Sequence, residues 1–242
     1  MIADVRPLRG LAAAVVFLLS VQVALLGIRV LTLFNRIRVA GRIDRHEWVS
    51  QAAANAADAW VRGAAGLWLL VFVATVIVWC VWQHRAQQAA HALVTGMETS
   101  AAWAVGCWFV PFVNYVKPFQ AMRELWRASE GTPSWQRQPT WPVLGWWWAT
   151  WLGFNALGWL QGTTLGADLD AIRRSDIVGL LSVILGVVAA ILAIQIVRQV
   201  STRLGAATVI AIALPADAPA SWRTGDGFPH PPGPPLPPPP AR

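Results

Sequence analysis

Charged side chains are scarce in this sequence. Lysine, arginine, aspartate and glutamate make up 13% of the 242 residues, whereas hydrophobic residues make up 56%. A soluble globular chain carries roughly a quarter of charged residues. Several apolar runs also approach the ~20 residues that a helix needs to cross a bilayer. The composition therefore excludes an ordinary soluble domain and indicates an integral membrane protein built as one helical bundle.

Patterns that carry catalysis or bind metals are missing as well. The sequence has no HExxH motif, no phosphate-cradling glycine loop and no Cys-x-x-Cys motif. Cys80 and Cys107 both lie in apolar stretches, which is typical of small packed side chains. His84, His91 and Glu98 recur at heptad spacing, but such a step spans ~10.5 Å, too far for two side chains to share one ion without help. We expect no metal, no cofactor and no enzymatic activity.

Basic residues nevertheless outnumber acidic ones, and the formal net charge is +7. The arginines flank the apolar runs, where they orient a membrane protein and contact anionic lipid head groups. No basic-aromatic module of the kind that binds nucleic acid accompanies this charge. We therefore expect the lipid bilayer, and not nucleic acid, to be the partner of these charges.

Four apolar segments are predicted to span the membrane, at residues 11–34, 63–82, 143–160 and 177–200. Arg29 lies near the far end of the first, and we interpret it as a side chain that snorkels to the interface. The alanine-rich piece before residue 63 is expected to lie on the surface or to extend the second span. With four spans both termini share a side, and the excess of arginine and lysine on that side predicts cytoplasmic termini.

The stretch 101–129 differs from these spans. Its first sixteen residues reach only ~24 Å as a helix, less than the ~30 Å hydrocarbon core, and Pro111 interrupts them. We therefore predict a re-entrant or interfacial element between spans 2 and 3, in preference to a fifth span. In the following segment, Phe119, Met122 and Leu125 lie on one apolar face of a basic helix, a pattern typical of a helix in the membrane interface.

Two further features concern assembly. Ser182, Gly186 and Ala190 form a stripe of small residues that permits close helix packing, and self-association through this stripe is the alternative interpretation. Residues 1–213 are predicted to form the membrane domain. From Leu214 the composition changes to proline-rich sequence, so residues 214–242 are predicted to be a disordered tail.

The candidate site combines the aromatic-rich motif with polar residues at membrane depth. The favoured role of Asn114 and Asn155 is to satisfy backbone groups freed by Pro111, and the alternative is a small polar pocket for a lipid head or solute. The residues selected for this pocket or partner surface are Trp108, Pro111, Asn114, Tyr115, Lys117, Pro118, Glu124, Trp126 and Asn155.

Several motifs resemble a known family. These are PLRGLA at 7–12, WCVWQHRAQQAA at 79–90, WFVPFVNYVKPFQAMRELWRAS at 108–129 and LGWWWATWL at 144–152. Together they resemble the bacterial integral-membrane family called domain of unknown function 4328, over about residues 7–200. The resemblance implies a multi-span protein of the bacterial inner membrane, often with a variable tail. The chain departs from the family pattern at Ala89, where an asparagine is usual, and no activity comes with the resemblance.

The leading functional hypothesis is a non-enzymatic scaffold or accessory subunit. It would bind anionic lipid or another membrane protein through the 101–129 motif. The alternative is a small transporter or channel, which would have to be an oligomer because a single four-helix bundle offers little path for an ion.

Overall fold

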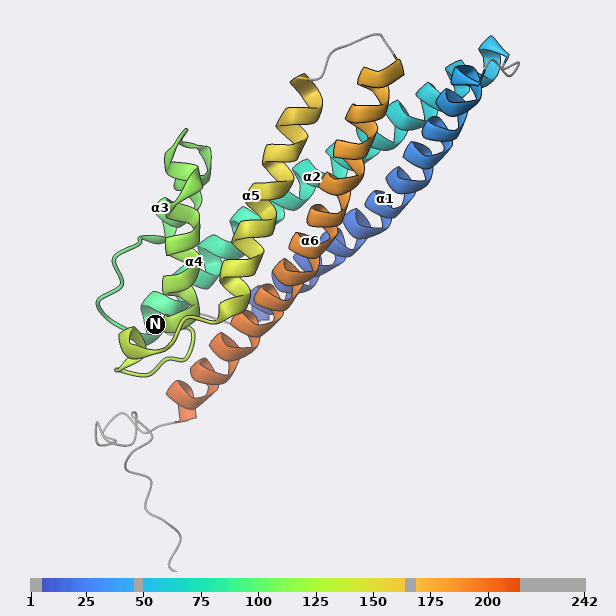
Figure 1. The fold of residues 1–242 in the computed structure, drawn as a ribbon. Coiled ribbons are helices and arrows are strands. Elements are labelled where there is room, and N and C mark those ends of the chain that lie inside the picture. The colour runs from blue at the N-terminus through green and yellow to red at the C-terminus, as the bar shows by residue number, and fades with distance from the viewer. Residues whose placement is uncertain (1–5, 46–49, 164–168, 214–242) are drawn as a thin grey trace, which may run out of the picture.

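The computed structural model describes residues 6–45, 50–163 and 169–213, and every regular element within them is helical. The predicted proline-rich tail at 214–242 lies outside the described residues. Four long helices form the body of the molecule (Figure 1): α1 (Arg6–Asp44), α2 (Gln51–Leu93), α5 (Pro142–Thr163) and α6 (Leu169–Ala213). Their apolar composition makes burial against one another, or against lipid, the favourable state.

The long helices pack in an open arrangement. α1 packs along both α2 and α6, α5 packs along α6, and α2 contacts α6 less extensively. Figure 1 shows that α6 crosses the whole molecule and lies between α1 and α5. The first described residues of α1 lie at the same end of the bundle as the end of α6. The chain therefore enters and leaves the bundle at one end.

The second predicted span proved to be the middle of a much longer helix. The alanine-rich piece, residues 63–82 and the following polar segment form one uninterrupted helix, α2, which is 43 residues long. At ~1.5 Å per residue this helix measures about 64 Å, roughly twice the ~30 Å hydrocarbon core of a bilayer. The alanine-rich piece therefore extends the span, which was one of the two expected outcomes.

Among the described residues, three helices are long and apolar enough to cross a membrane. The qualifying segments are Leu8–Val39, Ala59–Leu93 and Arg174–Ala213, on α1, α2 and α6. Large apolar side chains on these helices point outward, including Phe17, Leu70 and Ile184. Such a surface is typical of helices that face lipid. The chain is therefore an all-helical membrane-type protein.

The stripe of small residues on α6 serves packing within the chain. A Cβ atom added at Gly186 would lie 3.0 Å from the ring of Phe154 on α5 and 3.3 Å from Leu26 on α1. Ser182 Oγ donates a hydrogen bond to the carbonyl of Phe154 over 3.4 Å. α5 and α1 therefore cover this part of the stripe within the chain, and self-association stays a prediction.

The 101–129 segment forms a helical hairpin beside α5 (Figure 1). α3 (Ala101–Gly106) continues into the short 3-10 helix η1 (Cys107–Phe109), and η2 (Val113–Tyr115) precedes α4 (Lys117–Ala128). Pro111 separates the two halves, and Phe112 adopts a left-handed φ of 63°, which is strained for a bulky residue. Residues 101–116 therefore do not form a continuous helix.

The apolar face of α4 packs on protein, so this face is not the surface that would contact lipid. Met122 and Leu125 are fully buried, and Trp126 is 8% exposed. α4 contacts α2, α3 and α5, and Arg203 of α6 covers Trp126. The amphipathic pattern was read correctly, but hydrophobic periodicity cannot distinguish a protein surface from a lipid surface.

Gly131 lies in the loop between α4 and α5, a few residues before the short helix η3 (Trp135–Arg137). This glycine should tolerate substitution poorly. Its φ is +71°, and an added Cβ would lie 2.8 Å from Ala207 Cβ on α6. We expect Gly131→Ala to destabilise the protein by about 1–3 kcal/mol from the backbone alone. Thermal unfolding in detergent measures the loss. Gly145→Ala on α5 is the control, because a Cβ there meets nothing within 4 Å. Equal melting temperatures for the two variants would contradict this account.

Candidate functional site: a tryptophan-lined cavity with two polar pockets

A tryptophan cluster joins the hairpin to the bundle. Its ring centroids lie 4.8–6.5 Å apart between neighbouring members, within the range of favourable aromatic pairs. The cluster consists of Trp79, Trp82, Trp108, Trp147, Trp148 and Trp151. The three consecutive tryptophans of α5 do not act alike: Trp147 and Trp148 are buried, whereas Trp146 is 68% exposed. An outward indole at this position is typical of a membrane boundary.

Gln83 of α2 is the polar centre of this cluster. Its Oε1 atom accepts hydrogen bonds from the indoles of Trp79, at 3.1 Å, and Trp108, at 2.9 Å. Its Nε2 atom donates to the carbonyl of Ala104 in α3, at 3.1 Å. The side chain is fully buried. Gln83 therefore fixes the position of the broken segment against α2 and satisfies three buried polar groups at once.

Next to the cluster lies a central cavity of about 240 Å³. All four long helices and η1 line it, and its walls are mostly aromatic or aliphatic. They include Leu19, Leu26, Phe72, Val76, Trp79, Trp108, Trp151 and Ala193. The polar contribution comes from Gln22 and Thr75, which are hydrogen-bonded to each other at 2.6 Å. This cavity is suited to an apolar ligand, because its walls are mostly apolar and Gln22 and Thr75 are paired with each other.

A second cavity, the Arg29 pocket, adjoins the central cavity and has a volume of about 570 Å³. Trp68 and Phe154 line both cavities. Arg29 Nη2 donates a hydrogen bond to Gln161 Oε1 on α5, at 2.9 Å. Asn155 also lines this pocket, and its Nδ2 atom donates to the carbonyl of Trp151, at 2.7 Å. The guanidinium of Arg29 thus contacts the last turn of α5, and its snorkelling to a membrane interface stays a prediction.

A third cavity, the basic basin, lies between α4 and the loop that precedes α3. It has a volume of about 710 Å³ and is lined by Lys117, Arg123 and Arg127, together with Glu98 and Glu124. The Glu124 carboxylate accepts hydrogen bonds from the backbone N–H groups of Glu98 and Thr99. Two amides therefore offset one of the two acidic charges, which leaves the basin with a basic character.

Cys107 also lines the basic basin, where its thiol is buried. Burial raises the pKa of this thiol above its usual value, because desolvation disfavours the thiolate. The hydrogen bond at Cys107 and the charge of Lys117 oppose this shift to a smaller extent. A neutral thiol is a weak nucleophile, so the basin has the properties of an anion-binding surface more than those of a thiol active site.

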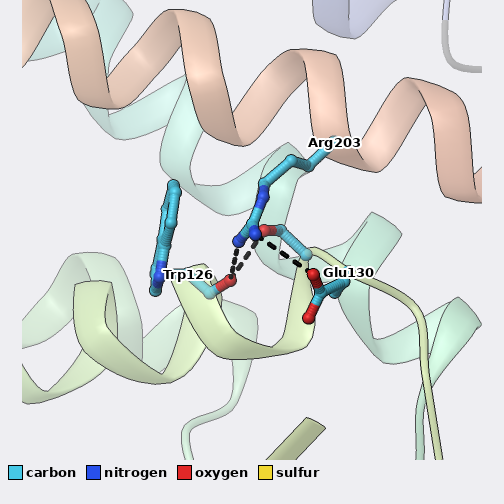
Figure 2. A network of polar contacts seen from close by, with 4 residues as sticks. Trp126, Glu130 and Arg203 are labelled. Carbon is cyan, nitrogen blue, oxygen red and sulfur yellow. Dashed lines mark hydrogen bonds and ion pairs between the residues drawn. The ribbon is translucent and has the colours of Figure 1, made fainter. Parts of the chain in front are cut away.

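Trp126 is part of the core at the lower end of α6. The guanidinium of Arg203 lies 3.9 Å from the centre of its ring, and Trp141 stacks on it at 4.8 Å. Figure 2 shows Arg203 between the Trp126 ring and the Glu130 carboxylate, to which it donates a hydrogen bond at 3.2 Å. This cation–π and ion-pair arrangement docks α4 on α6. Trp126 therefore stabilises the fold and does not line any of the three cavities described.

The structure distributes the nine predicted residues over several places. Trp108 lines the central cavity, Lys117 and Glu124 line the basic basin, and Asn155 lines the Arg29 pocket. Pro118 is buried at the start of α4, whereas Pro111 and Tyr115 are exposed at the tip of the hairpin. Asn114 Oδ1 is buried and has no hydrogen-bond partner among the described residues. Asn114 and Asn155 therefore do not share a pocket.

Several important residues were not selected from the sequence. Gln83 follows Trp79 by four residues on a helix, a spacing that places the two side chains together and could have identified the pair. The sequence carried no comparable signal for Trp68 or Gln161, because their partners are distant in the chain. Arg29 was noticed, but its direction depends on the packing of α5.

Replacing Gln83 with methionine should loosen the hairpin. The variant keeps a similar volume but leaves the indole donors of Trp79 and Trp108 without their acceptor, and each such group costs ~1–3 kcal/mol. The Ala104 carbonyl keeps only the weaker hydrogen bond from the Cys107 thiol, at 3.4 Å. We expect a lower melting temperature in detergent and a red shift of tryptophan emission. Gln88→Met is the control, because Gln88 lies on the same helix and is exposed. An unchanged melting temperature for Gln83→Met would show that the amide is not required.

Comparison with known proteins gives one family. The family model for a domain of unknown function, DUF4328, matches residues 45–202, which is more than half of the chain. The match includes α2, the hairpin, α5 and most of α6, but not α1, so it begins later than the resemblance in the opening PLRGLA motif suggested. Comparison with curated proteins found no match, and comparison with solved structures found none. On the strength of this match, the chain belongs to the DUF4328 family.

Proposed function

We propose that this protein is a non-enzymatic membrane protein that binds a lipid in the central cavity and acts as a scaffold or accessory subunit. The observation that carries the proposal is the cavity itself, which is lined by indoles and aliphatic side chains from all four long helices and η1. An apolar chain that enters it replaces unfavourable void with dispersion contacts. α2 and α5 both line the cavity, and their side chains meet there in the pairs Trp79–Trp147 and Trp68–Phe154.

In this proposal α1, α2, α5 and α6 each cross the bilayer. α5 has 22 residues, none of them charged, and at ~1.5 Å per residue it measures about 33 Å, enough to cross the ~30 Å core. Tryptophan lowers its hydropathy on common scales, although indole rings are favoured near the membrane boundary. In this proposal the hairpin enters one leaflet of the bilayer and does not cross to the other. Its exposed tip, which includes Phe109, Phe112 and Val116, supplies the apolar surface that this requires.

The hairpin end of the bundle faces the cytoplasm of a bacterial cell in this proposal, as do both termini. The excess of arginine and lysine at this end supports that orientation. Lys117, Arg123 and Arg127 of the basic basin would then meet the anionic head groups of the inner leaflet or an acidic partner surface. A small oligomeric transporter or channel remains the competing function, and it would need a polar path that the apolar walls of the central cavity do not favour.

Cysteine labelling in intact cells tests the placement of the hairpin. Single cysteines replace Ser50, Ser100, Val116 or Ser134 in a background that lacks both native cysteines. We expect Ser100 and Ser134 to be labelled from one side, Ser50 from the opposite side, and Val116 to be protected by lipid. Labelling of Ser100 and Ser134 from opposite sides would make the segment a true span and contradict the proposal.

Filling the central cavity should abolish lipid binding. Val76 lines the cavity, so Val76→Trp places an indole in the volume that an alkyl chain would occupy. Val73→Trp is the matched control, because Val73 lies one turn earlier on α2 and is 49% exposed. We expect native mass spectrometry to find lipid retained by the wild type and the control, but not by Val76→Trp.

Two outcomes would count against this function. A wild-type protein that retains no lipid, and takes none up after lipid is returned, would remove the central claim. Solute flux through proteoliposomes that disappears in Val76→Trp, while the protein stays folded, would favour the transporter.

A further inference from the structure

We propose that the Arg29 pocket binds the oxyanion of an acidic amphiphile whose single hydrocarbon chain lies in the central cavity. This inference rests on the proposed function, because the central cavity has to accept an alkyl chain. It adds the charge of the ligand, the residues that recognise its head and the direction in which the ligand lies.

Arg29 has no acidic partner among the described residues. It follows an uncharged run of residues, 11–28, within a candidate span, where an arginine normally pairs or faces a polar cavity. The guanidinium of Arg29 donates a hydrogen bond to the neutral amide of Gln161, and Arg29 forms no ion pair within the described part of the chain. Gln161 is held in turn by donating to the carbonyl of Ser175 at 3.2 Å. The remaining guanidinium N–H groups are available to an oxyanion, which they match in a two-pronged geometry.

The nearest acidic residue in the sequence to this contact is Asp176, which follows Ser175. It is 1% exposed, does not line the Arg29 pocket and makes contacts of its own. Asp176 therefore does not occupy the place that an anionic ligand would take beside Arg29.

Trp68 forms part of the wall that the central cavity and the Arg29 pocket share. Its indole Nε1 is buried and has no hydrogen-bond acceptor among the described residues. The ring is held by stacking on Phe72, at 5.0 Å between centroids, and by an edge contact with Phe154, at 5.9 Å. A buried donor without an acceptor is unfavourable.

The two cavities have complementary chemistry and share the walls formed by Trp68 and Phe154. The Arg29 pocket adds polar groups from Arg29, Asn155 and Gln161, whereas the central cavity adds mainly aromatic and aliphatic groups. An amphiphile has the same order of parts. The central cavity, at about 240 Å³, is smaller than the ~300–1,000 Å³ of pockets that enclose a drug-sized ligand, so it suits one chain.

Binding of brominated amphiphiles tests the inference, because bromine quenches tryptophan fluorescence on contact. The probes are dibrominated stearate and dibrominated stearyl alcohol, which share a chain and differ in the head, and inorganic phosphate, which has no chain. Purified protein is titrated in neutral detergent at a mildly alkaline pH that ionises the carboxyl group. We expect stearate to bind about tenfold or more tightly than the alcohol, as a charge-assisted contact to Arg29 requires.

The variants assign this preference to named groups. Arg29→Gln should reduce the preference for stearate to near unity while leaving the affinity for the alcohol unchanged. Arg62→Gln is the matched control, because Arg62 is an exposed arginine on α2, outside the three cavities. The retained affinity for the alcohol shows that each variant is folded.

The outcomes separate the two proposals. Equal affinity for stearate and alcohol, with both blocked by Val76→Trp, would overturn the oxyanion site and leave the lipid cavity standing. The absence of quenching by either probe would overturn both. Equal weakening of both probes by Arg29→Gln would show that Arg29 supports the cavity and does not bind the head. Displacement of stearate by inorganic phosphate alone would identify a site for free anions and overturn the amphiphile.

Discussion

The contact between Gln83 and two indoles is the interaction on which the arrangement of this protein depends. A helix broken by proline leaves backbone groups without their usual partners, and in an apolar environment each such group is costly. Gln83 donates to the carbonyl of Ala104 in the broken segment while it accepts from Trp79 and Trp108. The hairpin is thereby held against α2, and its Trp108 becomes a wall of the central cavity.

The hairpin contributes walls to two of the three cavities. On one side, Trp108 and Phe109 line the central cavity, and on the other, Trp103 and Cys107 line the basic basin. The apolar cavity and the basic basin are thus separated by a few residues of one broken helix. The Arg29 pocket contains the hydrogen-bonded pair Arg29 and Gln161, and it shares Trp68 and Phe154 with the central cavity. The proposed lipid-like ligand matches this alternation of polar and apolar surfaces better than a water-filled path does.

Much of the organisation could be predicted from local pattern. The apolar runs located the long helices, Pro111 located the break, and the periodicity of residues 117–128 located α4. Local pattern failed where two surfaces have the same chemistry. The apolar face of α4 meets protein and not lipid, and the small residues of α6 meet α5 and α1. The pattern of side chains indicates that a helix face avoids water, but it does not indicate whether protein or lipid covers that face.

The sequence by itself determined that the chain is helical, membrane-type and a member of the DUF4328 family, because composition, periodicity and motifs are properties of neighbouring residues. The tertiary structure alone decided that Asn155 lines the Arg29 pocket without Asn114, and that Arg29 pairs with Gln161. It also decided that Trp68 is shared by two cavities. These are contacts between helices far apart in the chain. Their pairing depends on how side chains of several helices fill space together, which no single segment encodes.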